Sequence, residues 1–250
     1  MLVVFIGSTA YAKSEIVKVN TDNNTVSINY DTTDYSNLKV VVKKGAKKYI
    51  YNLNSSNEVL PLQMGNGEYT VGLYKKVEGK KYKLLLCEKI NITNSNSNAV
   101  FLASVQNIKW KSDSEAAILA KELTKNAKTD KEKFEIIYNY IIGNITYDND
   151  KALKVNNTYL PTASETLSSQ KGICYDYASL MAVMLRSLNI PTKLVHGNST
   201  YTSVYHAWNE VLLNNEWIVV DTTIDSALKS ENVNYNYRKN TSDYIAKQVF

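Results

Sequence analysis

The sequence predicts an α+β protein in two parts, an all-β domain followed by a domain of helices and an antiparallel sheet. Two successive patterns of apolar residues predict this division. Up to about residue 92, short alternating or β-branched runs are separated by Asn, Asp, Gly and Ser, as in strands and turns. Beyond about residue 98, apolar residues recur instead at helical spacing. The chain has 250 residues and 44% hydrophobic content, which is enough for two small cores.

The first part, residues 13–98, is expected to be a small immunoglobulin-like sandwich of about six strands. Nothing in this part has the residue types of a catalytic site. The run NITNSNSN at residues 91–98 is polar and rich in turn formers, so it is the expected linker. The strands expected with most support are residues 25–30, 38–42, 48–53, 68–74 and 82–90.

Residues 1–12 resemble the end of a signal peptide. An apolar run at residues 2–6 is followed by Ala10-Tyr11-Ala12, a small-x-small pattern that precedes cleavage sites. An ordinary apolar strand is the alternative. We therefore expect a secreted or cell-surface protein that begins at Lys13 after cleavage. No later stretch reaches the ~18 apolar residues that a membrane span needs.

The net charge is mildly basic. There are 29 Lys and Arg against 24 Asp and Glu, a formal net charge of +5, with no long positive run. Nucleic-acid binding proteins concentrate their positive charge, so we expect no nucleic-acid partner. An excess of this size is compatible with association with anionic cell-surface polymers.

The second part, residues 99–250, is predicted to begin with helices and end in a sheet. Asp113 or Ser114 is expected to cap the first helix, Asp130 to cap the second, and Gly143 to end the second. The expected helices are residues 113–127, 130–143 and 172–188. Residues 146–170 have no clear period and are predicted to be a long surface loop. The expected strands are residues 193–196, 207–213 and 216–221.

The sequence contains two cysteines, which is too few for a disulfide framework. Cys87 lies in a strand-like run, where a small buried hydrophobic residue is expected. Cys174 lies in the first turn of the third predicted helix, where free N–H groups and the helix dipole stabilise a thiolate. Cys174 is therefore the candidate nucleophile. A bridge between Cys87 and Cys174 is an open alternative that would remove this nucleophile.

A histidine and an aspartate lie on the two strands that follow. A two-residue hairpin at Asn214-Asn215 pairs Leu213 with Glu216. It therefore puts Asp221 diagonal to His206 on one face, within reach of the imidazole. We expect Asp221 to accept the Nδ1 proton and to leave Nε2 facing the thiol.

Three segments together resemble a known family. The runs GICYDYASL at residues 172–180, HAWNEV at 206–211 and WIVVDTT at 217–223 are similar to the transglutaminase-like core of secreted bacterial proteins. The resemblance covers roughly residues 105–228. It implies a papain-like fold with Cys174 as nucleophile, His206 as base and Asp221 as the residue that orients the histidine. It implies no cofactor.

The activity implied by the resemblance is acyl transfer from an amide through a thioester on Cys174. The substrate would be a protein or peptide amide, typically of glutamine, and the acceptor a lysine amine or water. An oxyanion hole is also needed, with the Cys174 N–H as one donor and Gln170 or Tyr147 as the second. Tyr175 and Trp208, which lie within these motifs close to Cys174 and His206, are candidates for the substrate side.

Several alternatives stay open. Animal transglutaminases read GQCWVFA around the nucleophile, and the indole that shields their thioester has no assignable counterpart here. An exposed thioester favours hydrolysis, as in a deamidase or peptidase, whereas a shielded one favours cross-linking. A catalytically silent adhesion or scaffold module is the non-enzymatic alternative. His196 is a second candidate base without a nearby acid, and two histidines with two distant cysteines predict no metal site.

Overall fold

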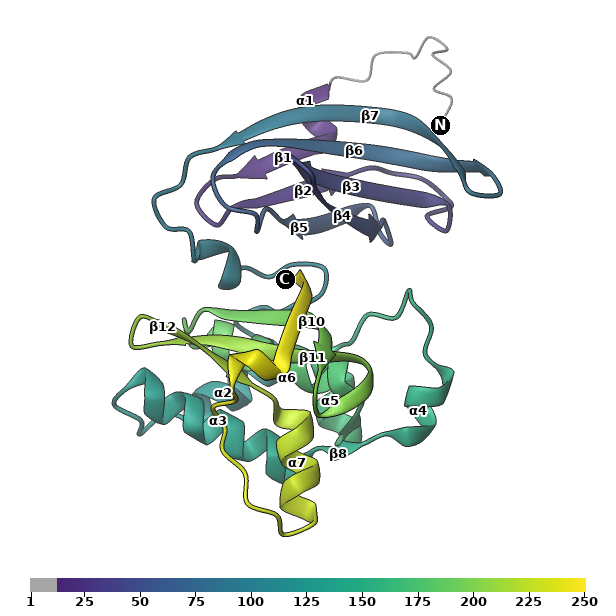
Figure 1. Cartoon of the computed structure of the whole chain (residues 1–250). Helices are drawn as coiled ribbons and strands as arrows, with labels where there is room; N and C mark the ends of the chain where they lie inside the picture. Colours follow the sequence, from purple (N-terminus) through teal and green to yellow (C-terminus); the bar gives the residue numbers. More distant parts are fainter. Residues whose placement is uncertain (1–12) are drawn as a thin grey trace. The chain divides into compact units, whose positions relative to one another are not determined.

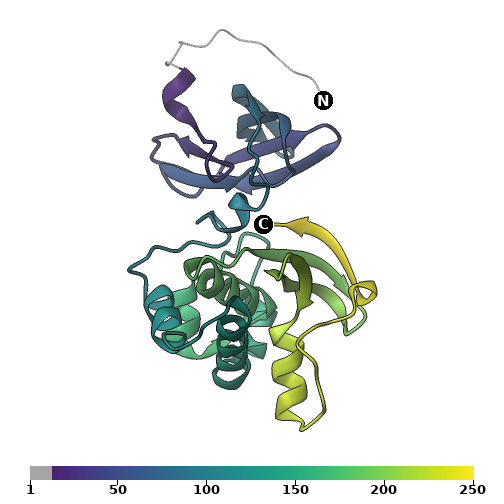
Figure 2. The same ribbon diagram turned by 90° about the vertical axis from the view of Figure 1, so that its left-hand side faces the viewer.

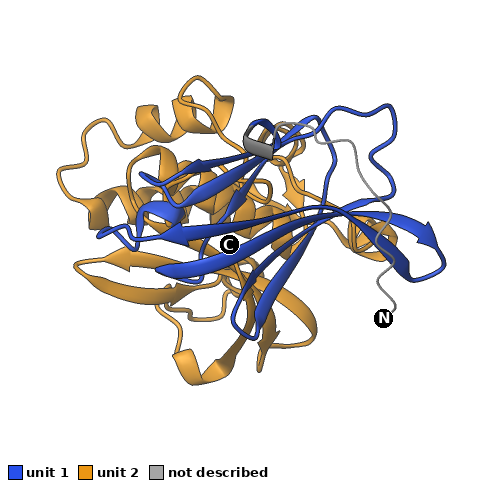
Figure 3. Cartoon of the chain, turned by 90° about the horizontal axis from the view of Figure 1, so that it is seen from above, with its two compact units in different colours: residues 1–100 blue, residues 101–250 orange. Residues whose placement is uncertain are grey.

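The computed structural model describes residues 13–250, so the predicted signal-peptide remnant at residues 1–12 lies outside the described residues. Contacts divide the chain into two compact units, Met1–Val100 and Phe101–Phe250 (Figure 3). The expected domain boundary at residues 98–99 lies close to this division. No helix among residues 13–250 is long and apolar enough to cross a membrane.

The described part of unit 1 contains a short helix and seven strands in two antiparallel sheets (Figure 1). Alternate residues of its longer strands are buried, as in Val26 and Ile28 or Val40 and Val42, so each sheet packs one face on the core. This arrangement agrees with the expected all-β class, and its immunoglobulin-like character stays a prediction. One sheet has the order β1-β2-β5 and the other β4-β3-β6-β7. The elements are α1 (Lys13–Ile16), β1 (Val17–Asn20), β2 (Thr25–Asn29), β3 (Leu38–Lys44), β4 (Lys47–Asn52), β5 (Asn57–Pro61), β6 (Gly67–Glu78) and β7 (Lys81–Ile92).

Two features of unit 1 differ from expectation. The segment expected to be a linker begins within β7, and its asparagines bind the rest of the unit. The Asn94 side chain donates to the backbone oxygens of Thr21 and Asp22. Cys87 is exposed, so the expectation that it is buried is wrong. Ile90 and Ile92 are the residues of β7 that turn toward the core, and alternation places Cys87 on the opposite face.

Unit 2 packs helices against a four-stranded antiparallel sheet with the order β12-β11-β10-β13. Figure 2 shows the teal and green helices beside the sheet, whose strands run from green to yellow. A two-stranded parallel pair, β8-β9, leads into the central helix α6. The elements are α2 (Glu115–Leu123), α3 (Asp130–Asn144), β8 (Thr146–Tyr147), α4 (Asn149–Lys154), α5 (Ala163–Ser169), β9 (Lys171–Gly172), α6 (Cys174–Ser187), β10 (Thr192–Ser199), β11 (Thr202–Leu213), β12 (Glu216–Val220), α7 (Thr222–Ser230) and β13 (Tyr244–Val249), with 3₁₀ turns at Ala99–Phe101 and Thr241–Asp243.

The helix α6 is buried along most of its length and is joined to the sheet by a side-chain amide. Asn209 of β11 donates from Nδ2 to the backbone oxygen of Ala178 in α6, at 2.9 Å, and to that of Lys193 in β10, at 3.0 Å. The side chain therefore connects three elements at once. Because Asn209 lies three residues after His206, this contact also fixes the strand that carries the histidine relative to the helix that carries Cys174.

The local details of the helices differ from the sequence expectation. The helix α2 ends at Leu123, four residues early. Thr129 caps α3 by accepting the Glu132 N–H, so Asp130 lies in the first turn, where its charge still suits the helix dipole. The helix continues through Gly143 to Asn144. Residues 146–170 contain β8, α4 and α5 and are not a structureless loop, because short elements give little periodic signal.

A buried arginine holds the far end of α6. Arg186 is 1% exposed and donates only to backbone oxygens: Nε to Thr192 at 2.9 Å, Nη1 to Ala103 at 2.6 Å and Nη2 to Phe250 at 3.0 Å. The guanidinium thereby joins α6 to the start of β10, to the segment before α2 and to the end of the sheet.

Replacing Arg186 with Met should lower the free energy of unfolding by about 3 kcal/mol or more, because buried carbonyl groups lose their donor. Urea unfolding measures this. Arg238, which is exposed and pairs with Glu216, provides the matched control. Arg238→Met should change stability by no more than about 0.5 kcal/mol. Equal effects of the two substitutions would show that the buried contacts contribute nothing.

Candidate active site

Cys174 is the first residue of α6 and is partly exposed. The strand β9 enters the helix through Ile173, which has extended backbone angles. The buried carboxylate of Asp176 accepts the Ile173 N–H through Oδ2 at 2.8 Å and so completes the helix start. The sulfur therefore lies at a helix N-terminus, where free N–H groups and the dipole stabilise negative charge.

Asp176 also ties the preceding loop to this helix start, a role that the sequence analysis missed. Its Oδ1 accepts the Tyr159 hydroxyl and is paired with the Lys151 ammonium at 3.2 Å. A Cβ at residue 172 would lie 2.5 Å from the Asp176 Cβ, so the close approach requires Gly172. The carboxylate three positions after the N-cap Ile173 was the available sequence signal.

His206 lies on β11 opposite Gly197 of β10 and is almost fully buried. Its Nε2 is 2.7 Å from Asp221 Oδ2, and its ring also hydrogen-bonds with the Cys174 side chain. Because Nε2 is taken by Asp221, Nδ1 is the nitrogen left for the thiol. The expected use of the two ring nitrogens is therefore wrong. Asp221 lies beyond the end of its strand and so meets the ring nitrogen that is farther from the histidine backbone.

Asp221 is reached by a different route from the one expected. The hairpin pairs Leu213 with Glu216 as predicted, but strand pairing ends at Asn209 and Val220. Asp221 then caps α7, with Oδ1 accepting the Ile224 N–H at 3.1 Å. The chain turns into this helix before a diagonal strand pair with His206 can form.

A tyrosine outside the three motifs completes the surroundings of Asp221. The Tyr244 hydroxyl, on β13, donates to Asp221 Oδ2 at 2.9 Å, which is the oxygen that also meets His206. Asp221 is fully buried, and hydrogen bonds with Ile224, His206 and Tyr244 satisfy its two oxygens. These contacts fix the carboxylate and, through it, the plane of the imidazole. No sequence motif pointed to Tyr244.

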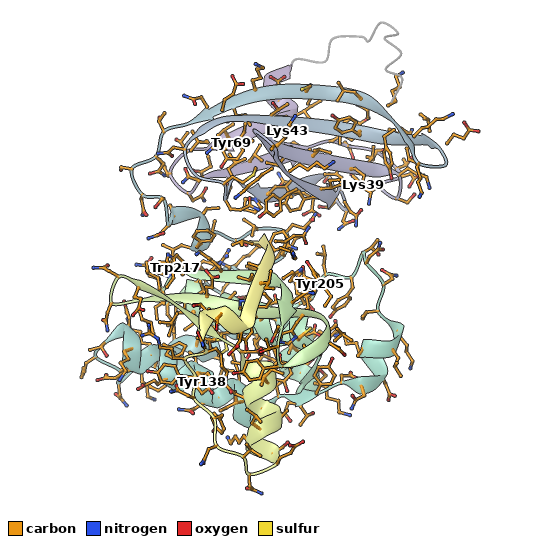
Figure 4. The ribbon with its side chains drawn as sticks, in the orientation of Figure 1. Lys39, Lys43, Tyr69, Tyr138, Tyr205 and Trp217 are labelled. Atoms are coloured by element: carbon orange, nitrogen blue, oxygen red, sulfur yellow. The ribbon has the colours of Figure 1, made fainter. Side chains whose placement is uncertain are left out.

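A second buried carboxylate fixes the helix that Asp221 begins. Asp225 of α7 pairs with Lys239 and accepts, at 2.8 Å, the hydroxyl of Tyr138, which is labelled in Figure 4. Tyr138 lies on α3 and Lys239 on the segment that leads to β13. The first turn of α7 is therefore held from two sides.

The surroundings of His206 favour its protonated form. Burial by itself lowers the pKa of the imidazole, but the hydrogen bonds with Asp221 and Cys174 outweigh burial and raise the pKa to about 10. His206 is therefore an imidazolium at neutral pH, and its charge lies beside the Cys174 sulfur. Such a neighbour favours the thiolate that a cysteine nucleophile requires.

The two residues considered as second oxyanion donors differ in position. Tyr147 on β8 pairs in parallel with Gly172, two residues before Cys174. Burial raises the pKa of the Tyr147 phenol, and the nearby charges of Cys174 and Asp176 raise it further. Gln170 is exposed at the C-cap of α5 with a φ of 53°. The structure thus brings Tyr147 near the sulfur.

The two candidates for the substrate side differ in their exposure. The Tyr175 ring lies edge-on to the His196 ring, with 4.5 Å between the ring centroids. Tyr175 follows Cys174 in the chain and is partly exposed. Trp208 is 1% exposed and packs with Val195 and Tyr244 in the core, so its expected substrate-facing position is wrong. Successive side chains of a strand alternate between faces, and Trp208 follows His206 to the buried side.

His196, the alternative base, lies in an apolar setting. Its ring contacts Tyr175 and Phe250 edge-on. Burial lowers its pKa to about 4, and the neighbouring His206 adds to this effect. No carboxylate partner for its ring is recorded within residues 13–250. The geometry therefore favours His206 as the base.

Both cysteines are free thiols, so the alternative bridge between Cys87 and Cys174 is absent. Across the part of the chain that the structure describes, no group of three or more His, Cys, Asp or Glu residues could hold a metal ion.

Comparison with known proteins identifies a family for part of the chain. Residues 117–222 match the family model of the transglutaminase-like superfamily. This range includes Cys174, His206 and Asp221. Residues 117–222 belong to the transglutaminase-like superfamily. The matched residues lie within unit 2, and the match to the family model does not extend to unit 1.

Curated relatives are similar to parts of this chain. The chain is 29% identical to the UPF0252 protein MJ1282 of Methanocaldococcus jannaschii, over 55% of this chain and 43% of the relative. It is 32% identical to human kyphoscoliosis peptidase, over 44% of this chain and 18% of that protein. The chain thus spans less than half the length of these relatives.

The solved structures that match this chain are more distant in sequence. A candidate cysteine protease of Cytophaga hutchinsonii has a TM-score of 0.49 at 16% identity, covering 90% of this chain and 75% of that one. The periplasmic domain of TgpA from Pseudomonas aeruginosa has a TM-score of 0.43 at 12% identity, covering 78% of this chain and 89% of that one.

The two histidines of the sequence should titrate far apart. In an NMR titration, we expect a pKa of about 10 for the His206 ring and of about 4 for the His196 ring. Asp221→Asn should move the His206 midpoint down by several pH units because burial then dominates. His196→Asn assigns the two signals.

The raised pKa of His206 also predicts how stability depends on pH. The folded value is above the ordinary value of about 6.5, so the stabilisation is complete below about pH 6.5 and is lost as the pH rises through about 10. The Asp221→Asn protein should lack this dependence. A His206 midpoint near the ordinary value in the unaltered protein would contradict the ion-pair interpretation.

Proposed function

We propose that unit 2 is a thiol enzyme that cleaves or transfers the acyl group of protein amides through a thioester on Cys174. The arrangement that supports this is the buried Asp221–His206 pair, whose remaining ring nitrogen meets a cysteine at a helix N-terminus. A purely structural histidine does not need a buried carboxylate on one side and a thiol on the other.

The geometry defines the steps. The Cys174 thiolate attacks the amide carbonyl carbon, and the carbonyl electrons move to oxygen. The oxyanion collapses to a thioester while His206 gives its Nδ1 proton to the departing nitrogen. His206, now neutral, takes a proton from the acceptor as the acceptor attacks the thioester, and the carbon–sulfur bond breaks to release the Cys174 thiolate. Asp221 keeps its hydrogen bond to Nε2 throughout, which holds the ring in one orientation.

We assign the oxyanion hole to the Cys174 N–H and the Tyr147 hydroxyl. Both lie at the junction of β8, β9 and α6, and the Tyr147 phenol is close enough to Cys174 for the two charges to interact. The exposed turn position of Gln170 makes its side chain the weaker candidate.

We propose water as the acceptor, because the indoles of Trp208 and Trp217 are packed against other side chains. Trp208 is in the core. Trp217, which is labelled in Figure 4, packs between Phe101 and the ammonium of Lys193, which lies 3.8 Å from the Trp217 ring centroid. Trp110 precedes α2 and hydrogen-bonds through its backbone N–H to Ser104. An unshielded thioester is hydrolysed, so we favour deamidation or peptide cleavage over cross-linking.

The substrate is expected to be an exposed segment of another protein. Tyr147 on β8 and Tyr205 on β11 are half exposed and would offer apolar contacts to a bound chain. The name of the kyphoscoliosis peptidase supports hydrolysis of proteins as the class of reaction. Secretion, inferred from residues 1–12 alone, would place this activity outside the cell.

The two free thiols allow a test within one molecule. Iodoacetamide at about pH 6 should modify Cys174 at least tenfold faster than the exposed Cys87, because Cys174 lies at a helix N-terminus beside the His206 ring whereas Cys87 lies within a strand. Peptide mass spectrometry after short exposures gives both rates.

His206→Asn should slow the modification of Cys174 to the rate of Cys87 or below, with Cys87 unchanged. His196→Asn is the matched histidine control and should leave the ratio as it is. Equal rates at the two cysteines in the unaltered protein would favour a catalytically silent binding module.

Mass spectrometry of a glutamine-containing peptide, with and without a primary amine, identifies the reaction. We expect deamidation or backbone cleavage to exceed amine addition. Cys174→Ala should abolish turnover, and Tyr147→Phe should lower kcat roughly 10²-fold while KM changes little, as for loss of an oxyanion donor. Gln170→Ala is the control and should keep near-normal rates. A large loss of kcat in Gln170→Ala with a near-normal kcat in Tyr147→Phe would instead identify Gln170 as the oxyanion donor.

A further inference from the structure

The hairpin formed by β6 and β7 extends past the rest of its sheet. The neighbouring strand β3 pairs with β6 only as far as Leu38 and Lys75, whereas β6 and β7 continue to pair up to Glu78 and Lys81. We call residues 75–83, with the sequence KKVEGKKYK, the hairpin tip. Figure 1 shows this end of the β6–β7 hairpin projecting beyond β3.

The hairpin tip is strongly cationic. It carries five exposed lysines and one acid, Glu78, which pairs with Lys81 at 3.3 Å. Lys75 lies directly opposite Lys83, an arrangement that costs stability because like charges face each other. Asp34 interacts with Lys75 at the base and offsets part of that charge.

The hairpin tip also accounts for much of the positive charge of the chain. Residues 101–250 contain 16 of the 29 basic and 16 of the 24 acidic residues, so the formal +5 belongs to residues 1–100. The second unit is therefore neutral overall, and the basic excess belongs to the unit without catalytic residues.

Apolar side chains lie among these lysines. Val77 is 60% exposed and Tyr82 is 40% exposed. Pairing passes from Lys76 and Tyr82 directly to Glu78 and Lys81, so Val77 is an extra, bulged residue with no strand partner. Lysines alone would suffice to protect a sheet edge from pairing. Exposed apolar groups among them need another reason.

This combination matches the chemistry of an anionic lipid surface. Lysine ammonium groups bind the phosphates of headgroups, while an aliphatic residue and a tyrosine enter the interface. A single-stranded nucleic acid would instead require a groove with several stacking aromatic side chains, and the projecting hairpin tip offers only Tyr82.

We propose that the hairpin tip is a membrane-contact site that binds anionic phospholipid headgroups through its lysines and inserts Val77 and Tyr82 at the interface. This site is independent of the proposed chemistry at Cys174. It would confine the catalytic unit of the same chain to substrates near a membrane surface.

Sedimentation with lipid vesicles tests the proposal on the full chain. The protein should bind vesicles of phosphatidylcholine mixed with phosphatidylglycerol, but not vesicles of phosphatidylcholine alone. The triple variant Lys80→Gln, Lys81→Gln, Lys83→Gln should lose about a hundredfold in partitioning to the anionic vesicles. Because these side chains are exposed, the variant should keep the urea unfolding profile of the unaltered protein, which confirms that unit 1 is folded.

The matched control removes three exposed lysines of unit 2, as Lys111→Gln, Lys128→Gln and Lys154→Gln, and should bind vesicles like the unaltered protein. A pair of substitutions, Val77→Ser and Tyr82→Ser, should weaken binding without changing its salt dependence. The proposal is overturned by equal losses in the two triple variants, by no preference for anionic vesicles, or by tighter binding to a single-stranded oligonucleotide than to the vesicles at the same salt concentration.

Discussion

The hydrogen bond between His206 and the buried carboxylate of Asp221 is the interaction on which the candidate site depends. Burial alone would keep the imidazole neutral, as it does for His196, which lies in the same sheet without a carboxylate partner. With Asp221 in place, the ring is positively charged beside Cys174. The two histidines differ because His206 has hydrogen bonds with Asp221 and Cys174 that outweigh burial, whereas burial dominates at His196.

The rest of unit 2 holds that pair in position. Asp221 caps α7, whose first turn is fixed by the contact of Asp225 with α3 and with Lys239. On the other side of the site, Asp176 fixes the start of α6, where the sulfur lies. Each of these carboxylates is fully buried and fully engaged, so neither helix start can shift without leaving a charge unpaired. Preorganisation of this kind allows a weak acid such as a thiol to act as a nucleophile at neutral pH.

Much of this could be predicted from the sequence because the signals were local. The change from alternating to helical periodicity marks the two units close to residue 100. The Asn214-Asn215 turn set the β11–β12 register correctly, since both residues adopt the positive φ values that a two-residue hairpin requires. The motifs around Cys174, His206 and Asp221 indicated the transglutaminase-like core that the family comparison identified.

What only the tertiary structure decided depends on contacts between distant segments. Tyr244 reaches Asp221 across 23 residues of chain, and Asp225 meets Tyr138 across 87, so no spacing pattern encodes either contact. The end of β12 at Val220, which turned the expected strand residue Asp221 into a helix cap, also reversed the roles of the imidazole nitrogens. The sequence alone thus determined which residue types were available for chemistry, because side-chain chemistry is local. Their orientation was left to the fold, because it is set by packing between elements that the chain brings together only when it is folded.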